Sequence, residues 1–161
     1  MKIELGLTGD YAVRSVLALA RARRRLKARE IAAEMALPAK YLPQVLGLLI
    51  KAGLVGSVAG PDGGYELARP ADEITLLQVI EAAEGPIRSS KCVLRGGPCN
   101  LDGTCAVHDA WSEAQAALAA KLGRATFGGL QRKAQRSAGR ATLEAASGPR
   151  RLVPVVGGAG T

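Results

Sequence analysis

A mainly α-helical fold with one small β-wing is predicted by three observations in this sequence of 161 residues. Between residues 11 and 84, four segments repeat apolar residues at helical spacing. Near residues 54–67, two short apolar segments flank a glycine-rich turn, which indicates a β-hairpin. From about residue 106, an alanine-rich segment carries an apolar stripe along one helical face. The expected architecture is a winged helix-turn-helix domain followed by a long helix.

The first helix is predicted from Tyr11 to about Ala22, where alanine, valine and leucine recur every three or four residues. The hydroxyl of Thr8 is placed to cap its start. Six of the nine residues from 21 to 29 are arginine or lysine. Helix capping alone does not require so many cations. They form either a solvated charged face or a surface that grips phosphate.

Two further helices are separated by a tight turn. Residues 28–35 form a short amphipathic helix, residues 36–38 interrupt it, and a second helical pattern over residues 42–50 is closed by Gly53. This arrangement predicts a helix-turn-helix whose second helix enters the major groove of DNA. Pro43 fits only if it lies in the first turn of that helix, where its missing N–H has no helical partner.

A glycine-rich turn over residues 59–64 joins two predicted strands at residues 54–58 and 65–67. It lacks the GxxxxGK[ST] pattern and leads into a strand, which argues against a nucleotide-binding loop. Close approach of its backbone to a DNA groove explains the glycines better. We therefore expect a wing with Gly60 and Pro61 at its tip.

The next helix is expected to start at Thr75 as its cap and to stop at Gly85 and Pro86. The long helix that begins near residue 106 has an apolar stripe, made of Val107, Trp111, Ala114, Leu118 and Leu122. Because the preceding domain is already complete, a second copy of this helix is expected to cover the stripe in a twofold dimer. Packing against its own winged domain is the alternative.

The chain is accordingly divided into four parts. Residues 1–85 form the winged helix-turn-helix domain, 86–105 a cluster-binding loop, and 106–133 the dimerisation helix with a short C-terminal helix. Residues 134–161 contain five glycines and two prolines with little apolar content, which predicts a flexible tail.

All three cysteines and the only histidine fall within seventeen residues, in the order Cys92, Cys99, Cys105 and His108. Glycines and a proline between them allow the backbone to bring thiolates and an imidazole within about 2.0–2.3 Å of a metal. Packing of free thiols in a core is the alternative, but their polar neighbours argue against it. Zinc and an iron–sulfur cluster both accept these donors. Intervals of six and five residues favour the larger iron–sulfur core.

The net charge of +8 concentrates at the two ends, since residues 1–70 carry eleven Lys/Arg against six Asp/Glu. This excess favours a polyphosphate partner, whose counterions are released on binding. Five aromatic residues offer few stacking platforms for RNA, so double-stranded DNA is expected. No apolar run reaches the roughly 20 residues of a membrane span, and no leader pattern is present, so a cytoplasmic protein without a membrane partner is expected.

An enzyme is not expected. A thiol mechanism with Cys105 as nucleophile and His108 as base is conceivable, because one helical turn brings the two side chains together. Apart from Asp109, however, no orienting carboxylate or oxyanion donor is evident.

Four stretches taken in order resemble the IscR/NsrR-type winged helix-turn-helix transcription regulators over about residues 1–130. They are LTGDYAVRSVLALA, EIAAEMALPAKYLPQVLGLLIKAGLV, GPDGGYELARPADEITLLQVIEAAEG and CAVHDAW. The resemblance implies a homodimeric DNA-binding regulator, a repressor. It also implies that an iron–sulfur cluster controls operator affinity and senses nitric oxide, redox or iron–sulfur status. A cluster-free or zinc-stabilised repressor of the same fold is the alternative.

The resemblance also implies the cluster ligands. They are Cys92, Cys99 and Cys105, with His108 as the fourth ligand of a favoured 2Fe-2S cluster. In the 4Fe-4S alternative, Asp10 of the other subunit is the fourth ligand. A first-turn carboxylate favoured by the helix dipole is the other interpretation of Asp10. The sequence departs from the IscR branch in the first cysteine interval, at Pro43, and at Ala59, where that branch places an arginine in the wing.

The expected DNA contacts are on the helix-turn-helix, the basic segment and the wing of a dimer bound to a near-palindromic operator. Lys40, Tyr41, Gln44 and Lys51 are expected at the major groove and its phosphates, Arg24 and Arg29 at the flanking backbone, and Gly60 and Pro61 at the minor groove.

Overall fold

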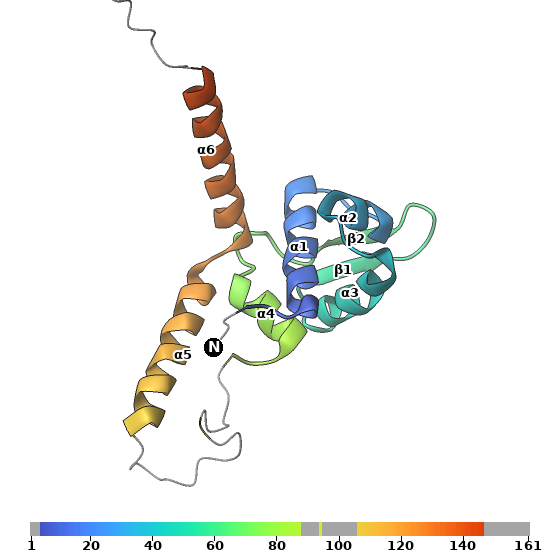
Figure 1. Cartoon of the computed structure of the whole chain (residues 1–161). Helices are drawn as coiled ribbons and strands as arrows, with labels where there is room; N and C mark the ends of the chain where they lie inside the picture. Colours follow the sequence, from blue (N-terminus) through green and yellow to red (C-terminus); the bar gives the residue numbers. More distant parts are fainter. Residues whose placement is uncertain (1–3, 88–93, 95–105, 147–161) are drawn as a thin grey trace, which may run out of the picture. The chain divides into compact units, whose positions relative to one another are not determined.

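The computed structural model describes residues 4–87, 94 and 106–146, and within these ranges it shows helices joined by one two-stranded sheet (Figure 1). The elements in chain order are α1 (Leu7–Ala22), α2 (Ala28–Met35), the 3₁₀ helix η1 (Ala39–Tyr41), α3 (Leu42–Lys51), β1 (Val55–Val58), β2 (Gly64–Leu67), α4 (Leu76–Glu84), α5 (Ala106–Arg124) and α6 (Phe127–Ala146). The predicted mainly α fold with a β-wing is confirmed. No helix in the described ranges has the length and apolar character needed to cross a membrane.

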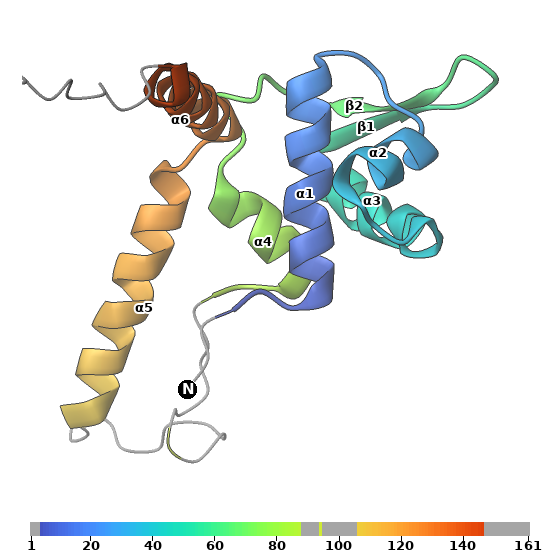
Figure 2. The ribbon, with the colours of Figure 1, turned by 45° about the horizontal axis from the view of Figure 1, so that its top comes forward.

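Helix α1 is the central element of the winged domain. Figures 1 and 2 both show it between α4 on one side and the group formed by α2, α3 and the sheet on the other. It starts four residues before the predicted Tyr11, and Thr8 lies inside its first turn. The proposed Thr8 cap is therefore wrong. The cap residue is Gly6, which has no side chain to accept a hydrogen bond.

A carboxylate from another helix takes over the capping of α1. Glu84, the last residue of α4, accepts a hydrogen bond from the backbone N–H of Gly9 at 3.0 Å through Oε1. Its negative charge lies where the helix dipole of α1 favours an anion. A Cβ at Gly9 would overlap this carboxylate, so the absence of a side chain there is what admits Glu84.

The helix-turn-helix forms as the sequence predicted. Helix α2 ends at Ala36, which adopts a left-handed conformation with φ of 51°, and Leu37 donates to the Ala32 carbonyl at 2.9 Å. Pro43 lies in the first turn of α3, as its chemistry requires. Gly53, with φ of 68°, redirects the chain after α3.

The predicted wing is also confirmed. Strands β1 and β2 pair antiparallel with Val55 opposite Leu67 and Val58 opposite Gly64. On the other edge of β2, Leu26 adds a single bridge to Tyr65: Leu26 N donates to Tyr65 O at 2.9 Å, and Tyr65 N donates to Leu26 O at 2.8 Å. The turn that connects the strands projects away from the helices in both views (Figures 1 and 2).

Helix α4 begins at the predicted cap. The Thr75 hydroxyl accepts from Gln78 N at 3.2 Å, while the Gln78 side chain accepts from Thr75 N at 3.0 Å. The end of α5 returns to this point, because Thr126 forms a bridge with Thr75. Phe127 N then donates to Ile74 O at 2.9 Å.

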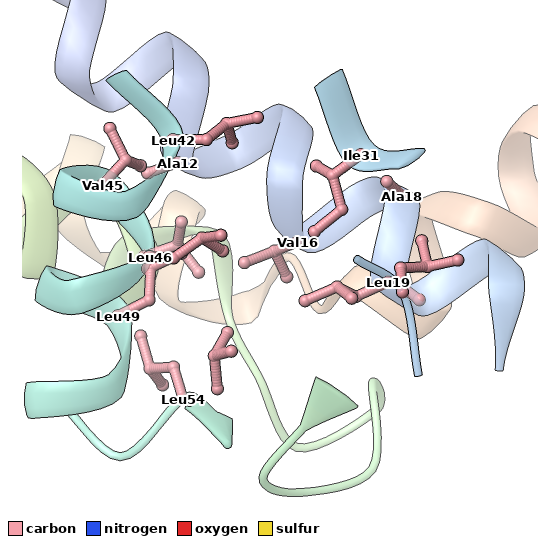
Figure 3. Packing of buried hydrophobic residues seen from close by; sticks show 14 of the residues in the cluster. Ala12, Val16, Ala18, Leu19, Ile31, Leu42, Val45, Leu46, Leu49 and Leu54 are labelled. Carbon is pink, nitrogen blue, oxygen red and sulfur yellow. The ribbon is translucent and has the colours of Figure 1, made fainter. Parts of the chain in front are cut away.

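The core of the winged domain is aliphatic (Figure 3). Leucine, isoleucine, valine and alanine side chains from α1, α2 and α3 meet in it, among them Val16, Ile31 and Leu46, none of which is exposed. Phe127 is also fully buried in this cluster. The core of residues 1–85 therefore includes a side chain from beyond the long helix.

The apolar stripe of α5 is only partly covered in the single chain. Trp111 and Leu122 are half-buried, whereas Val107 and Leu118 are 45% and 37% exposed. An apolar surface remains open along the helix, which is what a further packing partner requires.

Helix α6 extends through Ala146, although the sequence favoured an irregular segment from residue 134 onward. Four of the five glycines and both prolines of residues 134–161 lie after residue 147. Residues 134–146 contain five alanines, two arginines, a glutamine, a leucine and a glutamate, all of which have high helix propensity. Within the described residues, the chain divides into two units between residues 131 and 132, inside α6.

Candidate nucleic-acid interface

The exposed outer face of η1 and α3 is the candidate recognition surface. Leu42, Val45, Leu46 and Leu49 are buried, so α3 is held against the domain by its inner face. Lys40, Tyr41, Gln44 and Lys51 are all exposed. Gln44 and Lys51, two α-helical turns apart, share one side of α3, and Lys40 and Tyr41 lie just before it on η1. The four residues expected at the major groove are therefore all exposed, on η1 and on one side of α3.

Tyr41 is anchored at the start of this surface. Its ring lies 6.4 Å from the ring of Tyr11 on α1, centroid to centroid, with an interplanar angle of 31°. The Lys40 ammonium lies 4.8 Å from the centre of the Tyr41 ring, within the range of a cation–π contact. Tyr41 nevertheless keeps 45% of its surface exposed. It both positions Lys40 and remains available to a partner.

We call residues Arg23–Lys27, between α1 and α2, the basic strap. Arg24 forms an ion pair with Glu30 at 3.1 Å, and Arg25 with Glu66 of β2 at 3.4 Å. The Glu30 carboxylate also accepts from Lys27 N at 2.7 Å. The pKa of Glu30 is lowered, first by this backbone hydrogen bond and then by Arg24. Arg29 is exposed on α2.

The wing turn is neutral to acidic. Gly63 N donates to Gly60 O at 3.0 Å, and Pro61 and Asp62 occupy the two positions between them. Gly60 has φ of 104°, a backbone conformation that glycine adopts without strain. Gly60 and Pro61 are exposed. Between this turn and the start of α2 lies an open groove of about 460 Å³, to which Lys27 and Tyr65 contribute.

Asp10, the alternative cluster ligand, is bound by an arginine one helical turn away. Arg14 donates from Nε to Oδ1 at 2.9 Å and from Nη2 to Oδ2 at 2.6 Å. Arg14 Nη1 also donates to the Met35 carbonyl at the end of α2, at 3.0 Å. The hydrogen bond to Asp10 is the main cause that raises the pKa of Arg14. A ligand role for Asp10 would require it to exchange these bonds.

His108, one of the predicted metal ligands, lies on α5. It is exposed in the first turn, and its Nε2 lies 3.4 Å from Ser112 Oγ in the next turn. Cys92, Cys99 and Cys105 lie outside the described residues. In the ranges that are described, no three His, Cys, Asp or Glu side chains gather as a metal site. An accessible imidazole beside the cysteine segment fits a ligand role.

The cysteine segment lies between α4 and α5 in the sequence, and a side chain of each helix forms a hydrogen bond with the backbone of Ile87. Glu81 Oε1 of α4 accepts from Ile87 N at 3.2 Å. Gln115 Nε2 of α5 lies at 3.5 Å from Ile87 O, to which it donates. The start of the segment is thus connected to α4 and α5 together.

Sequence reasoning missed the contributions of Arg14 and Glu84. The i, i+4 spacing of Asp10 and Arg14 was a usable signal for their ion pair. For Glu84 and Gly9, 75 residues apart, the sequence offers only two glycines near the start of a helix. The contact becomes visible only in the folded chain.

This chain is similar to known transcriptional regulators in sequence and in structure. The Rrf2 family profile, described as iron-dependent transcriptional regulator, matches residues 6–133. The helix-turn-helix-type transcriptional regulator IscR of Vibrio campbellii is 32% identical over 132 residues, covering 81% of this chain and 78% of that protein. Among solved structures, CymR, the global cysteine regulator of B. subtilis, aligns with a TM-score of 0.69 and 27% identity over 80% of this chain and 96% of CymR. The structure of IscR from T. potens aligns with a TM-score of 0.67 and 26% identity, covering 85% of this chain and 92% of that protein.

Proposed function

Since the chain belongs to the Rrf2 family of transcriptional regulators, we propose that it is a dimeric DNA-binding repressor whose operator affinity depends on an iron–sulfur cluster. The observation that carries the DNA-binding part is the exposed polar face of η1 and α3 on a helix-turn-helix with a wing beside it. The relatives are named as transcriptional regulators, and this activity needs no catalytic residues. The protein would act in the cytoplasm, where its DNA is.

The DNA contacts divide by chemistry. Gln44 can read base edges in the major groove, because its amide both donates and accepts hydrogen bonds. Lys40, Tyr41 and Lys51 contact the major groove and its phosphates, and Arg24 and Arg29 contact the flanking backbone. These cations supply affinity without sequence information. Gly60 and Pro61 bring the wing close to the minor groove.

Two copies of the chain pack through α5 in this proposal. The exposed Val107 and Leu118 then lie in the interface together with the half-buried Trp111 and Leu122. A twofold dimer presents two recognition helices, so its operator is near-palindromic, with half-sites spaced by a helical turn or a multiple of it.

Cys92, Cys99, Cys105 and His108 would hold the cluster, with 2Fe-2S favoured over a 4Fe-4S form ligated by Asp10 of the partner. A bound cluster supplies iron that reacts with nitric oxide and oxidants. Ile87, at the start of the cysteine segment, is hydrogen-bonded by both α4 and α5. A change in this segment therefore reaches the proposed dimer helix directly. Regulation requires that the loaded and unloaded forms favour different dimer geometries.

The test compares cluster-loaded and apo protein. The chain is purified without oxygen, its iron and sulfide are measured, and its affinity for a duplex selected from a random library is determined before and after nitric oxide. We expect bound iron, specific duplex binding and a tenfold or larger change on treatment. A variant with serine at all three cysteine positions should lack iron and the nitric oxide response. Equal affinity of the loaded and apo forms would refute cluster control.

A cluster-free or zinc-stabilised repressor is the second candidate. The structural similarity to CymR, a protein named as a cysteine regulator, favours it. Duplex binding by protein that contains zinc or no metal, unchanged by iron and sulfide reconstitution, would support this candidate. Spectra of His108→Ala and Asp10→Ala variants distinguish the two proposed fourth ligands.

A further inference from the structure

The wing turn has no cation of its own. From Val58 to Gly64, Asp62 is the one charged residue, and it is an anion. A wing that approaches a DNA backbone needs positive charge, because phosphate neutralisation supplies most of the non-specific affinity. The charge for this wing must come from a neighbouring segment.

The basic strap is fastened to the base of the wing. Leu26, at the centre of the strap, is 2% exposed and shares two backbone hydrogen bonds with Tyr65 of β2. A Cβ at Gly64 would lie 2.6 Å from the Leu26 carbonyl oxygen, so the strap and the strand approach as closely as a bare backbone permits. The flanking residues Arg25 and Lys27 are exposed. Folding thus places the backbone of these cationic residues beside the wing.

The cations of the basic strap differ in whether they already form an ion pair. Arg24 and Arg25 are paired with Glu30 and Glu66. Among the described residues, neither Arg23 nor Lys27 forms an ion pair, but only Lys27 lines the groove between α2 and the wing turn. Its ammonium is therefore the strap cation placed to bind a phosphate on the wing side.

We propose that Lys27 binds a backbone phosphate of the DNA duplex in the groove between the basic strap and the wing turn. The basic strap thereby supplies the positive charge that the wing turn around Ala59 lacks. Arg24 and Arg25 neutralise the nearby carboxylates and keep them from repelling the phosphate. This inference rests on the proposed DNA-binding function and adds a contact to it.

The test measures the salt dependence of duplex binding by the full chain, purified without oxygen. A fluorescent mixed-sequence 30-base-pair duplex is titrated at several salt concentrations with wild type, Lys27→Gln, Lys27→Arg and the control Lys121→Gln. Lys121 is an exposed lysine on α5. The slope of log affinity against log salt is negative, and each lost phosphate contact reduces its magnitude by about 0.9. Lys27→Gln should reduce this magnitude by about 0.9 per subunit, and Lys27→Arg should keep the wild-type slope.

A second duplex, selected by the wild type from a random library, separates phosphate from base contacts. Lys27→Gln should lower the affinity for both duplexes by the same factor, because phosphates carry no sequence information. A change in their ratio, or a slope equal to that of Lys121→Gln, overturns the inference and leaves the proposed function intact. A wild type that binds neither duplex overturns the proposed function and this inference with it.

Discussion

The hydrogen bond between Glu84 and Gly9 predicts that the effect of one substitution changes sign with its background. Gly9→Ala places a methyl group where the Glu84 carboxylate lies, so the carboxylate must withdraw. The same substitution removes a glycine from a helix, which favours folding by up to about 1 kcal/mol. The three nearest atoms to the added Cβ all belong to Glu84.

The expected free energies follow from these two effects. Loss of a hydrogen bond to a partly exposed carboxylate, with its helix-dipole interaction, costs about 1–2 kcal/mol, which is the expected effect of Glu84→Ala. In the wild-type background the gain offsets much of the loss, so Gly9→Ala costs between zero and about 1.5 kcal/mol. In the Glu84→Ala background only the gain remains, and Gly9→Ala should stabilise by about 0.5–1 kcal/mol.

The assay is urea unfolding of the full chain, followed by circular dichroism at one fixed protein concentration because the proposed dimer would otherwise shift the midpoint. Glu84→Gln is the matched control. It keeps an acceptor oxygen and loses only the charge, so it should cost about 0.3–1 kcal/mol. Additive effects of Gly9→Ala and Glu84→Ala would refute the contact as the reason for glycine at this position.

Three further results are expected. Gln44→Ala should relax base preference at one operator position by about 1–3 kcal/mol with an unchanged salt slope, measured on duplexes randomised at single positions; an equal loss on all of them would exclude base reading. Gly64→Ala should lower the melting temperature, since Gly64 has φ of 151° and the new Cβ would press on Leu26 O; an unchanged melting temperature would show that the strap can yield. Because the pKa of Glu30 is lowered, its ionised form stabilises the fold above its ordinary pKa of 4.5, and that stabilisation is lost as the pH falls through the folded value. Glu30→Gln should therefore flatten the loss of stability below pH 4.5 in acid unfolding curves, and parallel curves for variant and wild type would contradict this.

Local signals were sufficient for most of the fold. The α2 helix, the first-turn position of Pro43, the Thr75 cap and the glycine-rich hairpin each depend on residues close in sequence, and each is confirmed. The start of α1 was misplaced for the opposite reason. Its cap comes from Glu84, and a search for a nearby hydroxyl selected Thr8 instead.

The sequence predicted which residues of the candidate site are exposed, but it did not predict which segments of the site contact one another. Exposure of Lys40, Gln44 and Lys51 followed from the periodicity of the apolar residues around them. The attachment of Leu26 to Tyr65 did not, because a single bridge between distant residues leaves no periodic pattern. Whether Cys92, Cys99 and Cys105 converge with His108 stays a prediction from spacing and resemblance.

The burial of Phe127 decides how short a folded fragment of this protein can be. A fragment that ends at residue 85 would keep α1 to α4 and both strands but would lack the Phe127 ring, which is fully buried in their apolar core. Removing a buried phenylalanine costs about 3–5 kcal/mol, a large share of the stability of a small domain. Truncation anywhere before Phe127 would have the same consequence, so the winged domain should stay folded only while it remains joined to the chain beyond α5.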